Sequence, residues 1–299
     1  MSAVGLSVDV DSVATHLAGY GVAGVCDDGS AYRIAIPRIL EMLARNDARC
    51  TFFLIASEAA RFPEVVRSIA ERGHEVASHS YSHPVPFQDL ARPEMVLEMQ
   101  RSREVLESLA GTVVSGFRAP SWGVSPQMVS VLEEVGYQYD ASEYPGILRH
   151  FMRMAVALRS ERAQTPRDRP RVRRSGGRQT GRVRAIDGGA AWEIPVCKGA
   201  FGFPYYHTMR VMAPAWLFRL IERRALRRRP FVRYVCHAVD FMGMTEDRLD
   251  PRIGRHPGMQ MCLHGKLELA QEAMGALKSA GRIVPLVEVL EGAKGSLEG

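Results

Sequence analysis

Residues 73–83 read GHEVASHSYSH, and this stretch decides the fold. Residues 75–78 predict a short strand, which runs directly into a segment that contains two histidines. His79 and His83 stand four residues apart, so on a helical turn both imidazoles would project from one face and could hold one cation. With nine histidines in 299 residues, such a pair arises often enough by chance that the spacing alone does not separate a metal ligand from a structural histidine.

On both sides of this stretch, short apolar runs alternate with amphipathic segments. Predicted strands cover residues 4–10, 50–56, 113–118, 137–141, 192–196, 231–236 and 283–286. Predicted helices cover residues 36–46, 63–72, 92–109, 127–135, 214–224 and 270–279, and residues 17–30 predict a loop over the mouth of the fold. This rhythm indicates an α/β fold with a parallel sheet or a (β/α) barrel, in which active sites lie just after the strands.

The composition is that of one folded domain with a local excess of positive charge. Hydrophobic residues make up 46% and charged residues 24% of the 299 residues, so neither a disordered nor a fibrous class is favoured. We interpret residues 1–299 as a single domain with a flexible, arginine-rich insertion at about residues 159–186. The net charge of +6 suggests an anionic partner, although the excess is concentrated in this insertion and at residues 223–229.

Two carboxylates end the first predicted strand. Asp9 and Asp11 have one residue between them, which puts both side chains on the same face of the strand after an otherwise apolar run. Two acids held together there would repel each other. A metal that binds one of them removes this repulsion and leaves the other to take a proton from water. The competing interpretation is a loop carboxylate that caps the following turn or helix.

Three more polar residues follow predicted strands. Arg118 could orient Asp9 and keep it ionised through a fork of donors, although an ordinary surface arginine would look the same in the sequence. His237 follows a clear strand, and an imidazole near a carboxylate can stay protonated and act as a general acid. Asp140 and Asp240 are the carboxylates that could take this place beside His237.

Together these segments resemble the polysaccharide deacetylase family, whose members have a NodB-homology domain of the carbohydrate esterase 4 type. The second motif of that family is matched closely by residues 73–83 and by the TFFL run at 51–54. The other motifs are matched by DVD at 9–11, RAPSW at 118–122, a shortened YDAS at 139–142 and VCH at 235–237. Ser121 stands where the third motif usually has an aromatic residue. The resemblance covers the chain apart from the insertion and implies a distorted (β/α) barrel with about seven parallel strands.

The resemblance also implies a role for each site residue. It makes Asp9 the catalytic base, with Arg118 supporting it, and His237 the general acid, steadied by Asp140 or Asp240. The implied metal ligands are Asp11, His79 and His83. Two imidazoles and one carboxylate favour a single zinc ion with an open position.

The expected activity is therefore metal-dependent hydrolysis of an amide in an N-acylated amino sugar, by a deacetylase or a deformylase. Residues 4–12 and 234–238 are similar to the branch of the family that deformylates undecaprenyl-phosphate-linked aminoarabinose, so a lipid-linked sugar is one candidate substrate. WEIPV at 192–196 is a phrase shared with allantoinase-like members. The alternatives are a metal-independent, allantoinase-like amidase on a small cyclic amide or ureide, and a non-catalytic carbohydrate-binding homologue.

Other features of the sequence bear on the location and the partners. Residues 1–11 show no secretory signal, which predicts a cytoplasmic protein. The basic and apolar residues 149–159, and the predicted helix 214–224 beside its arginine cluster, predict peripheral contact with an anionic membrane at its inner face. Packing of both segments on the barrel is an equally good interpretation. The insertion lacks interleaved aromatic residues, so we expect no nucleic-acid partner.

Two further motifs suggest alternative functional residues. Residues 19–24 spell GxGxxG, but no apolar strand leads into them and no helix opens from them, which disfavours dinucleotide binding. His264 is a rival for the general acid, because some family members have a Leu-x-His sequence in that region. It ranks behind His237, which ends a clearer strand.

Overall fold

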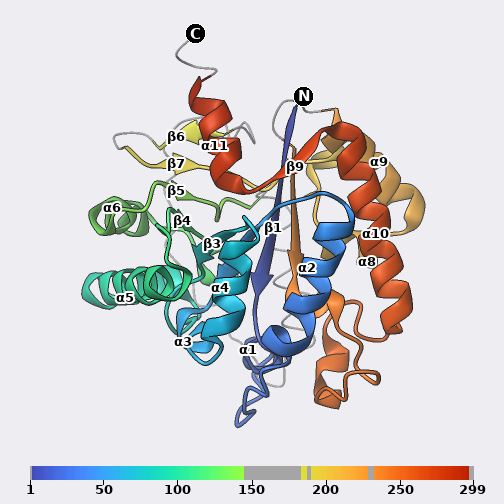
Figure 1. Ribbon diagram of the computed structural model, residues 1–299, viewed down its shortest axis with the longest axis horizontal. Coiled ribbons are helices and arrows are strands. Elements are labelled where there is room, and N and C mark those ends of the chain that lie inside the picture. Colours follow the sequence, from blue (N-terminus) through green and yellow to red (C-terminus); the bar gives the residue numbers. More distant parts are fainter. Residues whose placement is uncertain (1, 145–182, 187–189, 228–231, 296–299) are drawn as a thin grey trace.

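The computed structural model describes residues 2–144, 183–186, 190–227 and 232–295, and these residues form one nine-stranded sheet with helices around it (Figure 1). The strands are β1 (Ala3–Val10), β2 (Thr51–Leu54), β3 (Glu75–Ser78), β4 (Gly116–Phe117), β5 (Tyr139–Asp140), β6 (Arg184–Ala185), β7 (Trp192–Glu193), β8 (Val232–His237) and β9 (Arg282–Val284).

The sheet is a half-barrel of mostly parallel strands. Its order is β6-β7-β5-β4-β3-β2-β1-β8, and β9 pairs with the first residues of β1. Among the described strands only the pair β6 and β7 is antiparallel, at one edge of the sheet. The strands β8 and β6 end the path and do not pair with each other, so the barrel stays open. This confirms the expected NodB-type α/β architecture, with eight parallel strands where about seven were expected.

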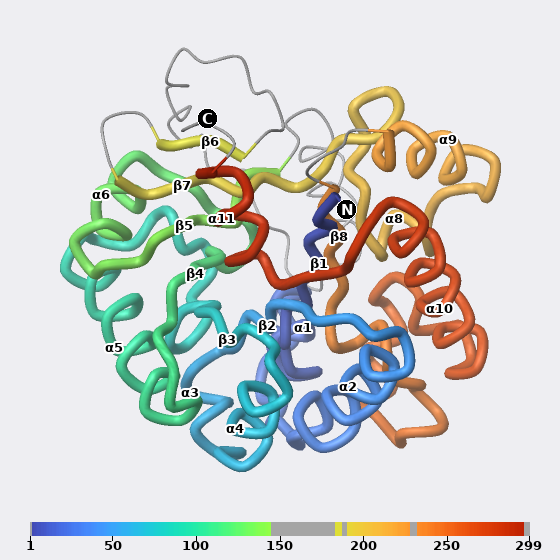
Figure 2. The backbone as a smooth tube through the Cα atoms, turned by 45° about the horizontal axis from the view of Figure 1, so that its top comes forward, coloured from blue at the N-terminus to red at the C-terminus, as the bar shows by residue number. Residues whose placement is uncertain are grey.

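The helices form an outer ring around the curled sheet, and α11 crosses one end of it (Figure 2). The α-helices are α1 (Val13–Gly19), α2 (Ile36–Arg45), α3 (Ala56–Ala59), α4 (Pro63–Glu71), α5 (Arg92–Ala110), α6 (Pro126–Val135), α8 (His207–Met212), α9 (Ala215–Leu226), α10 (Leu263–Ala280) and α11 (Leu286–Gly295). Short helical turns are η1 (Ala31–Ala35), η2 (Phe87–Asp89), η3 (Pro120–Trp122), η4 (Ala200–Gly202), η5 (Ala238–Phe241) and η6 (Pro251–Arg255).

Strand β1 determines what faces the helices and what faces the interior of the half-barrel. Its even-numbered residues, Val4 to Val10, belong to the main apolar core, whereas positions 5, 7, 9 and 11 hold Gly, Ser, Asp and Asp. Because side chains alternate along a strand, the small and polar set points into the barrel. Gly5 lies against α11, where an added Cβ would come within 2.7 Å of the Leu286 side chain.

A buried polar network fixes α11 across the end of the barrel away from the site. Glu75 accepts hydrogen bonds from Thr51 (2.6 Å), Tyr139 (2.8 Å) and the backbone N–H of Val287 (3.1 Å). Burial raises the pKa of Glu75, and these donors offset part of that effect. The interior of the half-barrel is thus filled below the site, which leaves the opposite strand ends for chemistry.

Several boundaries differ from the sequence predictions. Residues 17–30 are not all loop, because α1 begins after Ser12, whose side chain accepts from the Thr15 N–H and caps the helix. Helix α10 begins at Leu263, seven residues before the predicted start. The last residues of the predicted insertion form β6, while residues 145–182, including 149–159, lie outside the described part of the chain. No helix among the described residues is long and apolar enough to cross a membrane.

Candidate active site

The predicted site residues converge at the carboxyl ends of neighbouring strands. Asp9 and Asp11 lie at the end of β1, His79 follows β3, Arg118 follows β4, and His237 ends β8. The registers pair Asp9 with Phe53 of β2 on one side and with His237 of β8 on the other. Parallel strands bring these ends to one edge of the sheet, which is where α/β folds place their sites.

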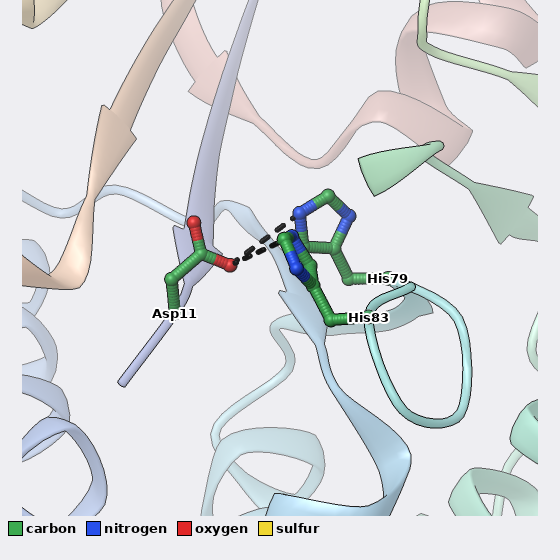
Figure 3. A group of neighbouring side chains, drawn as sticks. All are labelled: Asp11, His79 and His83. Carbon is green, nitrogen blue, oxygen red and sulfur yellow. Dashed lines mark ion pairs between the residues drawn. The ribbon is translucent and has the colours of Figure 1, made fainter. Parts of the chain in front are cut away.

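Three of these residues form a group with the geometry of metal ligands (Figure 3). The Nε2 atoms of His79 and His83 lie 3.4 and 3.7 Å from the same carboxylate oxygen, Oδ1 of Asp11. One ligand atom from each residue falls within 4.8 Å of the others. Two imidazoles and a carboxylate directed at one point are a donor set that zinc prefers.

The loop between the two histidines is bent, and it is not the helical turn that the spacing suggested. Ser80 and His83 have positive φ angles of 66° and 57°. The Ser80 hydroxyl accepts from the His83 N–H (3.0 Å), and Glu98 of α5 accepts from the N–H groups of Tyr81 (3.0 Å) and Ser82 (2.9 Å). Glu98 therefore holds the loop that presents both imidazoles. No local sequence signal predicted this role.

The three residues fit a divalent cation. Oδ1 of Asp11 is buried and has no hydrogen-bond partner, which is costly for a carboxylate unless a cation pairs with it. His79 Nδ1 lies 2.8 Å from the Arg118 carbonyl oxygen, so its N–H donates there and Nε2 is left with a free lone pair toward Asp11. Burial lowers the pKa of His79, and lowers that of His83 to about 4, so both imidazoles are in the neutral, ligating form at pH 7.

Arg118 holds Asp9 in its ionised form. Its guanidinium donates to Asp9 Oδ1, to the Ser7 hydroxyl (3.1 Å) and, through Nε, to the Ala141 carbonyl (3.1 Å). Burial alone would raise the pKa of Asp9, but the positive surroundings, above all the charge and the hydrogen bond of Arg118, outweigh it and the net pKa is lowered. Asp9 is therefore a carboxylate at neutral pH, as a general base must be.

Two aromatic rings enclose the same guanidinium. The Arg118 guanidinium carbon lies 4.0 Å from the ring centre of Phe53 and 4.8 Å from that of Trp122. Stacking of this kind fixes the plane of the guanidinium and so the direction of its hydrogen bonds. Trp122 and its neighbour Ser121 both have positive φ angles, 58° and 52°.

His237 stands between Asp9 and a second carboxylate. Its Nε2 lies 3.8 Å from Asp9 Oδ2, and its Nδ1 lies 4.0 Å from Asp240 Oδ2. Asp240 also accepts from the His237 backbone N–H (2.8 Å). Lys266 of α10 holds this turn from behind by donating to the carbonyls of Val239 (2.6 Å) and Met242 (2.7 Å). Asp240 is thus the carboxylate that the structure brings to His237.

Asp140 has other partners. It is fully buried, accepts from the Ser142 hydroxyl, and lies opposite Glu193 in the β5–β7 register. Burial raises the pKa of Asp140 to about 6, and burial together with the charge of Asp140 raises the pKa of Glu193. The Ser142 hydroxyl accepts from the Ala119 N–H (2.8 Å), so Asp140 supports the loop around Arg118, in place of the expected contact with His237. Glu193 was not among the residues predicted for the site.

Neither of the two competing motifs supplies a residue of this group. His264 is on the surface, with its side chain 83% exposed, and pairs with Glu268 at 3.2 Å one helical turn along α10. Residues 19–24 follow helix α1, where a dinucleotide fingerprint would follow a strand. Of the two histidines considered for the acid, His237 is the one beside Asp9.

Glu58 of α3 anchors the chain just after Asp11, and its titration is expected to affect stability. Its Oε1 accepts from the hydroxyls of Ser12 and Thr15, both at 2.8 Å. Burial raises the pKa of Glu58 from 4.5 to about 7, so the folded state binds a proton that the unfolded state has lost between those pH values. Its contribution to stability is complete below pH 4.5 and is lost as the pH rises through 7.

We therefore expect wild-type protein to lose free energy of unfolding relative to Glu58→Gln as the pH rises from 4.5 to 7, with a constant difference above that range. Urea unfolding of both proteins between pH 4 and pH 8 measures this difference. Glu64→Gln, on the exposed side of α4, is the matched control for the loss of a carboxylate at the surface. A flat difference for Glu58→Gln would contradict the prediction.

Comparison with known proteins agrees with this fold. Residues 21–139 match the model of the polysaccharide deacetylase family, a segment that includes both histidines of the metal-ligand group and Arg118. The chain is 33% identical over 143 residues to a peptidoglycan deacetylase of Helicobacter pylori, covering 46% of this chain and 48% of that protein. It is 32% identical over 111 residues to a chitooligosaccharide deacetylase of Azorhizobium caulinodans, covering 37% of this chain and 52% of the other. The matched region thus spans about half the length of these relatives.

Solved structures show the same fold over nearly the whole chain. A Mycobacterium smegmatis protein assigned to the polysaccharide deacetylases superposes with a TM-score of 0.60 at 20% identity, covering 98% of this chain and 90% of that one. PuuE allantoinase gives a TM-score of 0.58 at 16% identity, covering 97% and 89%. The fold and site define a half-barrel with a metal-ligand group at its strand ends. Residues 21–139 carry the match to the polysaccharide deacetylase family, the NodB or carbohydrate esterase 4 group.

Proposed function

We propose that this protein is a metal-dependent N-deacylase that hydrolyses the amide of an N-acylated amino sugar. The observation that carries the proposal is the buried Oδ1 of Asp11, which has no hydrogen-bond partner and faces Nε2 of His79 and of His83. His237 and the ionised Asp9 lie beside this group. The similarity to peptidoglycan and chitooligosaccharide deacetylases supports an acetylated sugar as substrate.

The residues divide the reaction between them. Asp11, His79 and His83 would hold one divalent ion, for which zinc is the best match, and that ion would polarise the amide carbonyl and acidify water. Asp9 accepts the proton of the attacking water, and His237 gives a proton to the nitrogen as the C–N bond breaks. The products are a carboxylate and a free amine. Arg118 keeps Asp9 charged, and Asp240 lies beside Nδ1 of His237.

The acyl group, the carrier and the location remain finer parts of the same proposal. We propose acetyl as the acyl group, because the two relatives named above are deacetylases; formyl, and a sugar linked to a lipid, are the variants suggested by residues 4–12 and 234–238. A cytoplasmic location is proposed with them and is checked by fractionation of cells that produce the protein. A lipid-linked substrate would also require contact with a membrane.

Activity of the purified protein tests the proposal. With zinc, we expect release of acetate from N-acetylated chitooligosaccharides or peptidoglycan fragments, and loss of release after chelation. A parallel panel of N-formyl amino sugars, assayed for formate, separates the two acyl groups. Hydrolysis of a cyclic amide or ureide that survives thorough chelation would instead identify an allantoinase-like amidase. Sugar binding without hydrolysis on the whole panel would identify a non-catalytic homologue.

A further inference from the structure

Helix α9 has one exposed face with an unusual composition. Residues 216, 219, 220, 223, 224 and 227 are exposed and follow the helical spacing of a single stripe. We call this stripe the α9 face; its members are Trp216, Arg219, Leu220, Arg223, Arg224 and Arg227. The opposite side of the helix is buried through Phe218, Ile221 and Ala225. The helix is therefore fixed to the domain by one side and presents four arginines and two apolar residues on the other.

Among the described residues, no carboxylate pairs with the arginines of the α9 face. The acid of this helix, Glu222, is already paired with Arg210 of α8 and accepts from Tyr205. Arg210 in turn reaches Glu272 at 3.2 Å. The nearby carboxylates are thus used, and the face keeps a local charge of four positive groups.

Apolar side chains are exposed on and beside the same face. Trp216 is 64% and Leu220 is 40% exposed. The turn η4 packs against α9, where Gly199 lies against Ile221, and carries Phe201, which is 77% exposed and has a φ of 54°. Large apolar groups that stay in water beside a basic cluster are a common mark of a binding surface. From the sequence alone, Phe218 and Ile221 could have belonged to this set, but the structure buries both.

We propose that the α9 face docks the protein on an anionic lipid bilayer. The arginines bind lipid phosphates, and Trp216, Leu220 and Phe201 enter the interfacial layer. A second copy of the chain fits poorly, because a symmetric contact would set arginines against arginines. A nucleic acid would satisfy the arginines but offers no apolar layer for Leu220 and Phe201.

Docking through this face would leave the site open. Both views place α9 nearer the N-terminal end of β1, whereas Asp9 and Asp11 lie at its C-terminal end (Figures 1 and 2). The α9 face contributes no residue to the site. Docking on a membrane and hydrolysis therefore involve different residues and can be tested separately.

Flotation with vesicles tests this docking on the full-length protein, without substrate. We expect binding to vesicles of phosphatidylcholine that contain phosphatidylglycerol, weaker binding as salt increases, and little binding to phosphatidylcholine alone. Glutamine at positions 219, 223, 224 and 227 should lower the partition coefficient at least about tenfold. Serine at positions 216 and 220 should lower it too, because the apolar contribution is lost.

The controls remove the same charge and the same kind of apolar group elsewhere. Glutamine replaces the exposed arginines 45, 67, 92 and 282, and serine replaces Leu97, which is 63% exposed on α5. These variants should bind within about twofold of wild type if the α9 face is the docking surface. All variants retain the arginines of residues 159–184, so a loss specific to the α9 variants is assigned to that face. Equal loss in the control variants, or none in the α9 variants, would overturn the proposal.

Tryptophan fluorescence distinguishes a bilayer from another polyanion. Brominated phosphatidylglycerol should quench part of the emission of wild-type protein, and Trp216→Phe should abolish that part while Trp122 and Trp192 remain. Tight binding to a single-stranded oligonucleotide that is unchanged by serine at positions 216 and 220, together with no lipid quenching, would show a nucleic-acid surface and refute docking on lipid.

Discussion

The substitution Asp9→Asn is expected to lower kcat about 100- to 10,000-fold, which is the range that a positioned general base contributes. The change keeps the size of the side chain and removes the group that accepts the proton of water. Asp9 is buried, and Arg118 holds it as a carboxylate. Steady-state kinetics with acetate release measures the effect.

Two controls show whether the loss is chemical. Asp47→Asn, on the surface and with a φ of 48° that asparagine tolerates, should keep wild-type kinetics. Zinc content of Asp9→Asn should stay close to that of wild type, because Asp9 is not among the three proposed ligands. Wild-type turnover in Asp9→Asn would remove Asp9 from the mechanism.

The substitution His79→Ala is expected to lower turnover by a similar factor, because it weakens binding of the metal. It removes one of the three donors of Figure 3, and turnover should fall about 1,000-fold, which corresponds to roughly 4 kcal/mol of lost transition-state stabilisation. Binding is a second readout that does not depend on activity: zinc should raise the melting temperature of wild-type protein and leave that of His79→Ala nearly unchanged.

His264→Ala is the matched control for this prediction. It removes an imidazole from the surface of α10, so zinc binding and turnover should both stay at wild-type levels. The same variant tests the rival general acid, because loss of turnover in His264→Ala with intact zinc binding would favour His264 over His237. A His79→Ala protein that binds zinc as wild type does would contradict the assignment of the ligand group.

The strand ends were predictable because their signal is local. The apolar runs, the helix periodicity and the polar residues directly after strands can all be read along the chain, and they brought together Asp9, Asp11, His79 and Arg118. Strand β1 also contains a second local signal. Its alternation of apolar and small or polar residues predicts which side faces the helices, and it would have singled out Ser7 as a partner of the site.

Contacts between distant segments were not predictable in the same way. Glu98 lies in the middle of α5, where nothing in its own helix distinguishes it from other surface acids. The choice between Asp140 and Asp240 depends on how far β5 lies from β8 across the curled sheet, and sequence spacing does not contain that distance. The barrel is open because its two edge strands do not pair with each other. This property likewise cannot be predicted from any single segment of the sequence.

The alternation along β1 has a consequence for how such proteins can change. Residues at two-residue steps of about 6.6 Å have four different functions. Position 5 contacts α11, position 7 accepts from Arg118, position 9 accepts the proton, and position 11 is a proposed metal ligand. Inserting or deleting one residue before position 9 would exchange the interior and exterior sets together. We expect descendants of this chain to diversify through loops around the mouth, and the length of this strand to be among the features least free to vary.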